Sequence, residues 1–118
     1  TNTPLQALVL MNDPGYVEAA RAFAQHLLTM KKGMAEDARL RYAFRRTVSR
    51  QPTATELNVL KQIIAEQRTV FTQDKKAADQ LIAVGDITRP SGLDSGELAA
   101  WTALASVLLN LDETITRE

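Results

Sequence analysis

The apolar residues of this chain recur mainly at spacings of three and four, and no stretch alternates convincingly between apolar and polar positions. A three-and-four spacing places apolar side chains on one face of an α-helix, whereas strict alternation would be typical of a half-buried strand. The pattern therefore predicts an all-α fold, a single compact helical bundle of five to six helices. The predicted helices span residues 5–11, 14–30, 35–49, 54–71, 75–84 and 97–109.

The helix over residues 97–109 differs from the others because it is apolar on nearly all sides. It holds the only tryptophan of the chain, Trp101, and only Thr102 and Ser106 interrupt its apolar run after Glu97. A helix with this composition is buried among other helices. At about 1.5 Å per residue it is roughly 20 Å long, which is too short to cross a hydrocarbon core of about 30 Å. We therefore predict that it is the central helix of the bundle, not a membrane span.

Local signals predict where several helices begin and end. Thr53 with Glu56 three residues later forms a capping-box pattern, and Asp94 with Glu97 forms a similar one before the central helix. Gly33 is expected to close the helix over 14–30, since glycine readily adopts the left-handed conformation found at helix C-termini. The longest loop is predicted at residues 86–95. The central helix is expected to end or bend at residues 110–113 and to be followed by a polar tail.

The composition limits the possible functions. The 118 residues favour one domain, residues 1–118, and the absence of cysteine excludes thiol chemistry and disulfides within it. The net charge is zero, which gives no general attraction to nucleic acid. The first residue is Thr1 and no signal core follows it, so we expect the chain to be an excised or processed piece of a longer protein.

Charge is nevertheless segregated along the chain. Residues 31–50 hold seven basic and two acidic side chains, whereas residues 93–118 hold five acidic and one basic. On the predicted helix over 35–49, Arg39, Arg46 and Arg50 share one stripe, and Arg41 and Arg45 lie one turn apart on another. Such a helix could contact phosphates or sulfated sugars, but it lacks the interleaved aromatic residues of a nucleic-acid surface. The simpler interpretation is ion pairing with the acidic C-terminal segment, and both interpretations stay open here.

No other residue pattern predicts a reaction or a bound metal. His26 is the sole histidine and has no second ligand at metal-binding spacing, so we interpret it as a structural or surface residue. The adjacent pair Asn12 and Asp13 precedes Pro14, and helix capping explains it more simply than acid–base chemistry does. We therefore predict no catalytic residue, no cofactor site and no metal site in this segment.

Three stretches carry a resemblance to a known family. They are Asn-Thr-Pro-Leu-Gln-Ala-Leu at residues 2–8 with Asn-Asp-Pro at 12–14, Ser-Arg-Gln-Pro-Thr at 49–53 with Glu56, and Ala-Trp-Thr at 100–102 with Leu-Leu-Asn-Leu-Asp-Glu at 108–113 and Arg-Glu at the end. Together they resemble the C-terminal domain of unknown function in planctomycete cytochrome-c-associated proteins. Ser49 departs from the pattern, in which we expect glycine at this turn.

The resemblance implies a setting and no mechanism. Such proteins are large and exported, to the periplasm or beyond, and often carry a domain similar to cytochrome c toward their N-terminus. The haem-attachment motif Cys-x-x-Cys-His is absent here, so the resemblance assigns haem c to no residue of this segment. A role in polysaccharide breakdown has been suggested for these systems, although this segment has no recognisable hydrolase motif.

Two function hypotheses follow from the sequence and the resemblance. The first is a non-catalytic helical module for structure or interaction, whose partners are other domains of the parent chain. The alternative is an accessory part of an enzyme active site that other domains complete, with a polysaccharide-related reaction suggested by the resemblance. Neither hypothesis includes nucleic acid as a partner, and the oligomeric state is left open. The candidate interaction residues for either hypothesis are Asn12, Asp13, Arg39, Arg46 and Arg50.

Overall fold

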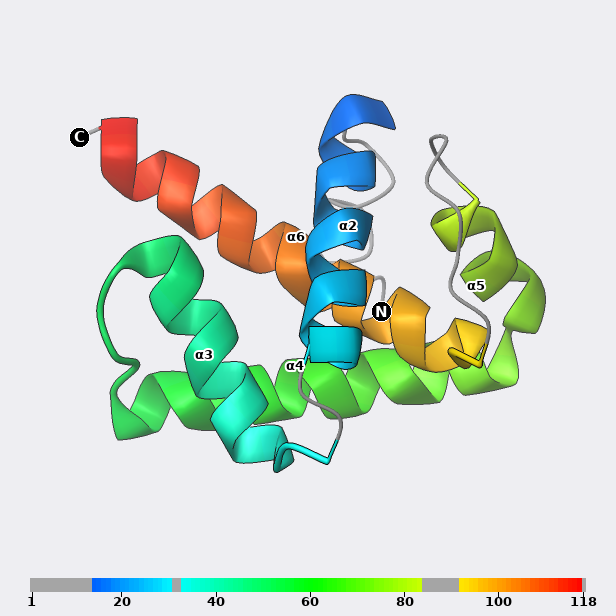
Figure 1. Cartoon of the computed structure of the whole chain (residues 1–118), viewed down its shortest axis with the longest axis horizontal. Coiled ribbons are helices and arrows are strands. Elements are labelled where there is room, and N and C mark those ends of the chain that lie inside the picture. The colour runs from blue at the N-terminus through cyan, green and yellow to red at the C-terminus, as the bar shows by residue number, and fades with distance from the viewer. Residues whose placement is uncertain (1–13, 31–32, 84–91, 118) are drawn as a thin grey trace.

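The computed structural model describes residues 14–30, 33–83 and 92–117, and every regular element in these ranges is a helix. The all-α prediction is confirmed. Figure 1 shows how the five described helices are arranged. They are α2 (Pro14–Met30), α3 (Glu36–Val48), α4 (Ala54–Gln73), α5 (Lys75–Ile82) and α6 (Ser95–Arg117).

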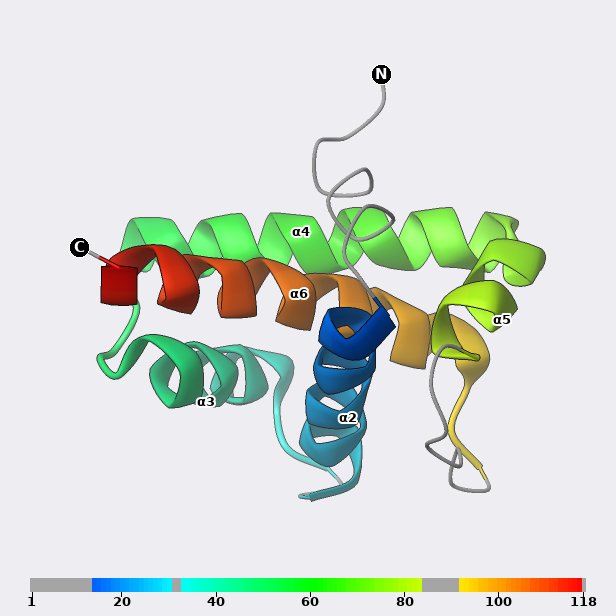
Figure 2. The same cartoon turned by 90° about the horizontal axis from the view of Figure 1, so that it is seen from above.

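Helix α6 is the centre of the bundle, as its apolar sequence predicts. It contacts all four other described helices, and residues 98–106 form an unbroken buried run. Figure 2 shows α4 along one side of α6 and α2 and α3 on the opposite side, with α5 near the beginning of α6. Trp101 is only 1% exposed, so the indole is a core side chain and not a surface anchor.

The other helices turn their predicted apolar stripes toward α6. The stripe of α4 is buried at Leu57, Leu60, Ile64 and Phe71, and α3 buries Leu40, Ala43 and Phe44. Helix α6 meets them with leucines and with alanines that are at most 1% exposed, Ala99, Ala100, Ala103 and Ala105 among them. Small side chains of this kind let neighbouring helices approach closely, so one helix can be covered on several sides at native packing density.

Three helix starts are capped by side chains. The capping box is confirmed, because the Glu56 backbone N–H donates to Thr53 Oγ1 at 3.1 Å and the Thr53 N–H donates to Glu56 Oε1 at 2.9 Å. The Glu97 N–H donates to Asp94 Oδ2 at 2.9 Å, which confirms the predicted start of α6. Asp74 accepts from the Ala77 N–H at 3.0 Å and thereby separates α5 from α4. These caps satisfy backbone donors that have no partner within the helix.

The predicted end of the central helix was wrong. Helix α6 passes through residues 110–113 and continues to Arg117, where a polar tail was expected. No glycine or proline follows Gly96, and the Asn110 side chain donates to the Ser106 carbonyl of its own helix at 3.0 Å. Polar residues alone therefore do not end this helix.

The remaining predicted boundaries either differ slightly from the structure or lie outside its described part. Helix α5 ends at Ile82, slightly before the predicted residue 84. The predicted helix over 5–11 and residues 86–91 of the predicted loop lie outside the described part of the chain. Within the described part, no helix combines the length and the apolarity needed to cross a membrane.

Candidate functional site

Arg39, one of the predicted interaction residues, is directed toward the interior of the bundle. Its Nε donates to the Leu27 carbonyl at the end of α2 at 3.0 Å. Its guanidinium carbon lies 5.9 Å from the centre of the Trp101 ring, within the range of a cation–π contact. Arg39 therefore joins α3 to α2 and α6, and its positive charge interacts with groups of the fold itself, the Leu27 carbonyl and the Trp101 ring.

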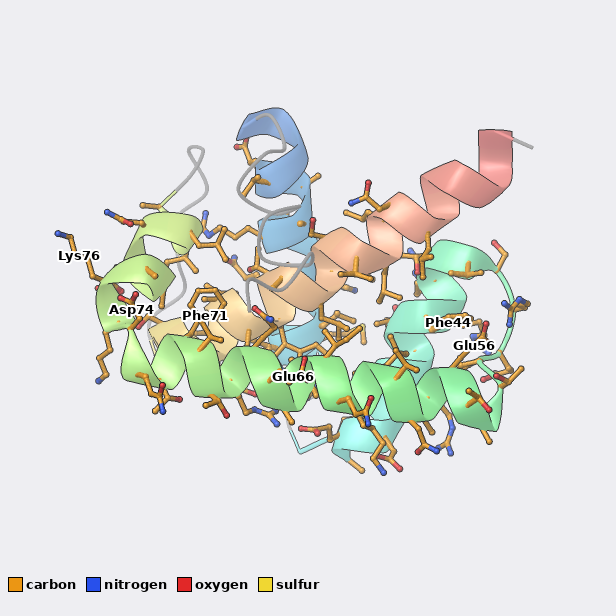
Figure 3. All side chains as sticks on the ribbon, turned by 180° about the vertical axis from the view of Figure 1, so that it is seen from behind. Phe44, Glu56, Glu66, Phe71, Asp74 and Lys76 are labelled. Carbon is orange, nitrogen blue, oxygen red and sulfur yellow. The ribbon has the colours of Figure 1, made fainter. Side chains whose placement is uncertain are left out.

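Arg50, at the turn between α3 and α4, also interacts with other residues of the fold. It makes a two-pronged ion pair with Glu56, with both nitrogen–oxygen distances at 2.8 Å. It also stacks 5.1 Å from the centre of the Phe44 ring. Figure 3 shows Phe44 and Glu56 at this end of the molecule. The paired guanidinium and the capping contact of Thr53 hold the pKa of Glu56 down, at about 2.

The remaining arginines of α3 face outward. Arg41, Arg45 and Arg46 are exposed, and no salt bridge joins any of them to another residue of the described ranges. The two acids at the start of the helix are engaged elsewhere, because Glu36 pairs with Arg68 and Asp37 with Lys61, both on α4. The outward face of α3 therefore carries positive charge that its own acids do not balance.

A shallow depression of about 280 Å³ lies along this outward face. We call it the α3 depression. Tyr42 is half-buried and packs against the hydrophobic core, so it forms a fixed part of the wall. The depression extends from the turn before α3 to the turn after it and is lined by Met34, Ala38, Arg41, Tyr42, Arg45 and Gln51.

The turn that carries Gln51 has an unusual backbone. Ser49 follows α3 with a φ of +68°, and it is the one non-glycine residue with positive φ in the described ranges. Its N–H donates to the Arg45 carbonyl at 2.9 Å, as in a left-handed helix end. The expectation of glycine at this position thus has a physical reason, since serine adopts this conformation at a cost.

A second polar cluster lies between α3, α4 and α6, and sequence reasoning missed it. We call it the Arg68 cluster, and its members are Arg68, Glu36, Glu97 and Trp101. Arg68 Nη2 lies 2.6 Å from Glu36 Oε1 and 2.7 Å from Glu97 Oε2, and Arg68 Nε donates to Glu97 Oε1 at 2.9 Å. The indole Nε1 of Trp101 donates to Glu97 Oε2 at 3.0 Å.

These contacts fix the charge state of the Arg68 cluster. The Arg68 guanidinium and the indole N–H lower the pKa of Glu97 below its ordinary value, although partial burial acts in the opposite direction. Hydrogen bonds from Glu97 and Glu36 raise the pKa of Arg68 further. Glu36 and Glu97 each lie about 30 residues from Arg68 in the sequence, so no local motif marks the cluster. Helix α4 carries two basic residues, Lys61 and Arg68, and nothing in the sequence distinguishes the one that joins it.

The other predicted residues do not gather into a site. Asn12 and Asp13 lie outside the described part of the chain. His26 is exposed on α2, and the described ranges contain no group of three or more His, Asp or Glu side chains that could hold a metal. Arg46 is exposed near the α3 depression without lining it. Of the predicted arginines, Arg39 is directed into the bundle, Arg46 is exposed on α3, and Arg50 pairs with Glu56 at the turn after it, so the three do not form one site.

The fold and this geometry define an all-α helical domain with a basic depression on its surface. A family model described as PSD1, protein of unknown function (DUF1553), matches residues 1–64, which is more than half of the chain. The chain therefore belongs to this family. The matched range contains all six residues that line the α3 depression. No curated protein and no solved structure gives a significant match.

Proposed function

We propose that this chain is a non-catalytic helical module of a larger exported, cytochrome-c-associated protein, in which it docks against another domain. The observation that carries the proposal is the outward face of α3, where Arg41, Arg45 and Arg46 are exposed beside a depression. The exported setting and the association with cytochrome c rest on the sequence resemblance alone.

The composition of this face supports docking. Arginine, tyrosine and methionine are enriched at protein interfaces, and all three line the α3 depression. Tyr42 is half-buried and anchored on the core, so little conformational freedom would be lost when a partner covers it. A solvated face would more typically mix both charge signs, whereas the acids of α3 are directed to α4.

The charge states of the carboxylates favour a non-catalytic role. A general acid or base works best with a pKa near the working pH, which for a carboxyl group requires a raised pKa. Glu97 and Glu56 are shifted in the opposite direction by their arginine partners. Both carboxylates therefore stay ionised and act as structural partners of Arg68 and Arg50.

Arginine-selective modification with a dicarbonyl reagent, followed by peptide mass spectrometry, tests the docking role. We expect Arg41, Arg45 and Arg46 to react readily in the 118-residue chain and to be protected in the parent protein. Arg68 is the internal control, since its ion pairs should slow modification in both proteins. Equal reactivity of the three exposed arginines in chain and parent would contradict docking. Turnover of a glycan or ester by the chain alone would contradict the non-catalytic role.

A further inference from the structure

We infer that the α3 depression binds the carboxylate side chains of an extended acidic peptide segment. This inference rests on the proposed docking role and specifies the chemistry of the partner. The juxtaposition that carries it is two exposed arginines, Arg41 and Arg45, beside the half-buried ring of Tyr42 in one depression.

The helix geometry brings the two guanidinium groups to one place. Arg41 and Arg45 are four residues apart, and residues at this spacing are neighbours on a helix surface, with Cβ atoms about 5–6 Å apart. Ala38 precedes Arg41 by three residues and leaves open space between the longer side chains. Each guanidinium is a planar fork that can hold a carboxylate through two parallel N–H···O bonds. Two such forks one turn apart favour a ligand with more than one carboxylate.

The length of the depression favours a peptide. Its lining residues begin at Met34, before α3, and end at Gln51, after it. The lining residues on α3 itself run from Ala38 to Arg45, a rise of about 10 Å, which equals about three residues of extended chain. The amide of Gln51 can both donate to and accept from a peptide backbone. The volume of about 280 Å³ suits a few side chains laid along the surface more than an enclosed small molecule.

The lining also favours carboxylate over nucleic-acid phosphate. The Met34 and Tyr42 side chains offer apolar surface for the CH₂ groups of Asp and Glu, which a phosphate lacks. Nucleic-acid surfaces gain affinity from many cations, whereas this chain has no net charge and the basic face of α3 spans a single short helix. The two α3 acids are paired with α4, so they do not compete for the arginines from within the described fold.

Fluorescence anisotropy with a labelled hexaglutamate peptide and the 118-residue chain, at low salt, tests the inference. We expect saturable binding of hexaglutamate and none of hexaglutamine. The double variant Arg41→Ala/Arg45→Ala should bind at least about tenfold more weakly, because charge-assisted hydrogen bonds are lost. Arg41→Lys/Arg45→Lys keeps both charges without the forks and should give an intermediate affinity. Thermal melts monitored by circular dichroism check that each variant is folded.

The matched control is Lys75→Ala/Lys76→Ala, which removes the same charge from α5. Figure 3 shows Lys76 directed away from the bundle, at the end opposite α3. We expect this variant to bind within about twofold of the unmodified chain, since screened charges at that distance contribute little. An equal loss in both double variants would overturn the inference, because it would indicate unspecific charge attraction.

Three further outcomes would overturn it. They are equal binding of hexaglutamine, full affinity of the lysine variant, and displacement of hexaglutamate by a six-nucleotide single strand at lower concentration than by unlabelled peptide. The proposed function is tested separately, by arginine protection in the parent protein. Protected arginines without hexaglutamate binding would remove only the carboxylate assignment. Turnover by the isolated chain would remove the non-catalytic role and leave the peptide result standing.

Discussion

The Arg68 cluster and the outward face of α3 use the same side chain in opposite ways. Arg68 is half-buried between two carboxylates at 2.6 and 2.7 Å, and the cluster joins α3, α4 and α6. Arg41 and Arg45 lie on the neighbouring helix α3, are exposed, and have no salt bridge within the described ranges. The number of arginines on a helix therefore does not show whether their charge is available to a partner. The position of the nearby acids decides whether each arginine is paired within the fold.

The difference originates in the layout of α3. Its acids, Glu36 and Asp37, occupy the first turn, where their negative charge interacts favourably with the positive end of the helix dipole. Both side chains also form ion pairs with residues of α4. Its outward arginines occupy the later turns. The N-terminal end of α3 is thus tied into the bundle by charge, whereas the rest of its outward face keeps an unbalanced positive charge. Substitutions in the first region should change stability, and substitutions in the second should change binding.

The largest expected effect on stability is at Trp101. Its side chain is a large, fully buried part of the core, and its indole N–H donates to Glu97. Trp101→Ala should lower the free energy of unfolding by about 3 to 5 kcal/mol, the usual cost of truncating a buried aromatic residue. Urea unfolding followed by far-ultraviolet circular dichroism measures it. Val59→Ala is the control, since Val59 is 46% exposed and should cost far less. A loss below about 1 kcal/mol at Trp101 would contradict its central role.

The next effect compares the two regions directly. Arg68→Ala should cost about 1 to 2 kcal/mol, between the small value of an exposed ion pair and the larger one of a buried pair. Arg45→Ala on the outward face should change stability by less than about 0.5 kcal/mol. Both are measured by urea unfolding at neutral pH. Equal losses in the two variants would mean that the outward face also stabilises the fold, which would remove the contrast.

Lowering the pH is expected to reduce the free energy of unfolding by a smaller amount. Glu97 and Glu56 have a lower pKa in the folded chain than the ordinary value of 4.5, so their stabilisation is complete above that value and is lost as pH falls toward the folded pKa. The free energy of unfolding should therefore decrease from about pH 5 to pH 3. The effect is smaller than that of Arg68→Ala because protonation leaves the packing in place.

Carboxamide variants isolate this pH dependence. Glu97→Gln/Glu56→Gln cannot titrate at these positions, so it should be less stable at neutral pH and should show a flatter decrease toward acid. Glu66→Gln is the control, since Glu66 is exposed on α4 and has no ion pair to a described residue. An unchanged slope in the double variant would show that other groups cause the acid sensitivity.

Much of the fold could be predicted from the sequence because its determinants are local. Apolar spacing located α2, α3, α4 and α5 to within a few residues, and the Thr53 and Asp94 caps were recognisable from a glutamate three positions later. The end of α6 was missed because polar residues were interpreted as a stop, although no helix breaker follows Gly96. The burial of Gln67 was also missed, since a polar side chain on an apolar stripe gives no warning of it.

The candidate site was only partly predictable. Periodicity separates the inward and outward faces of α3, but it does not show which arginine meets a partner from another helix. Arg39 and Arg50 were predicted as interaction residues; within the fold they contact Trp101 and Glu56, contacts that the sequence did not indicate. Arg41 and Arg45 were recognised as a separate stripe, but only tertiary structure shows that Met34, Tyr42 and Gln51 complete a depression around them.

The smallest expected effect concerns Ser49, the residue that follows α3. Its positive φ strains the backbone beside the outward face of α3, whereas no residue of the Arg68 cluster has a positive φ. Ser49→Gly should raise the free energy of unfolding by about 0.5 to 1 kcal/mol, because glycine adopts a positive φ without the clash of a Cβ atom. Hexaglutamate affinity should stay within about twofold if the turn keeps Gln51 in place. Ser49→Ala is the matched control, since it removes the hydroxyl and keeps the Cβ, and it should give no gain in stability. A stability gain in the alanine variant equal to that of glycine would place the cost in the hydroxyl group instead of the backbone.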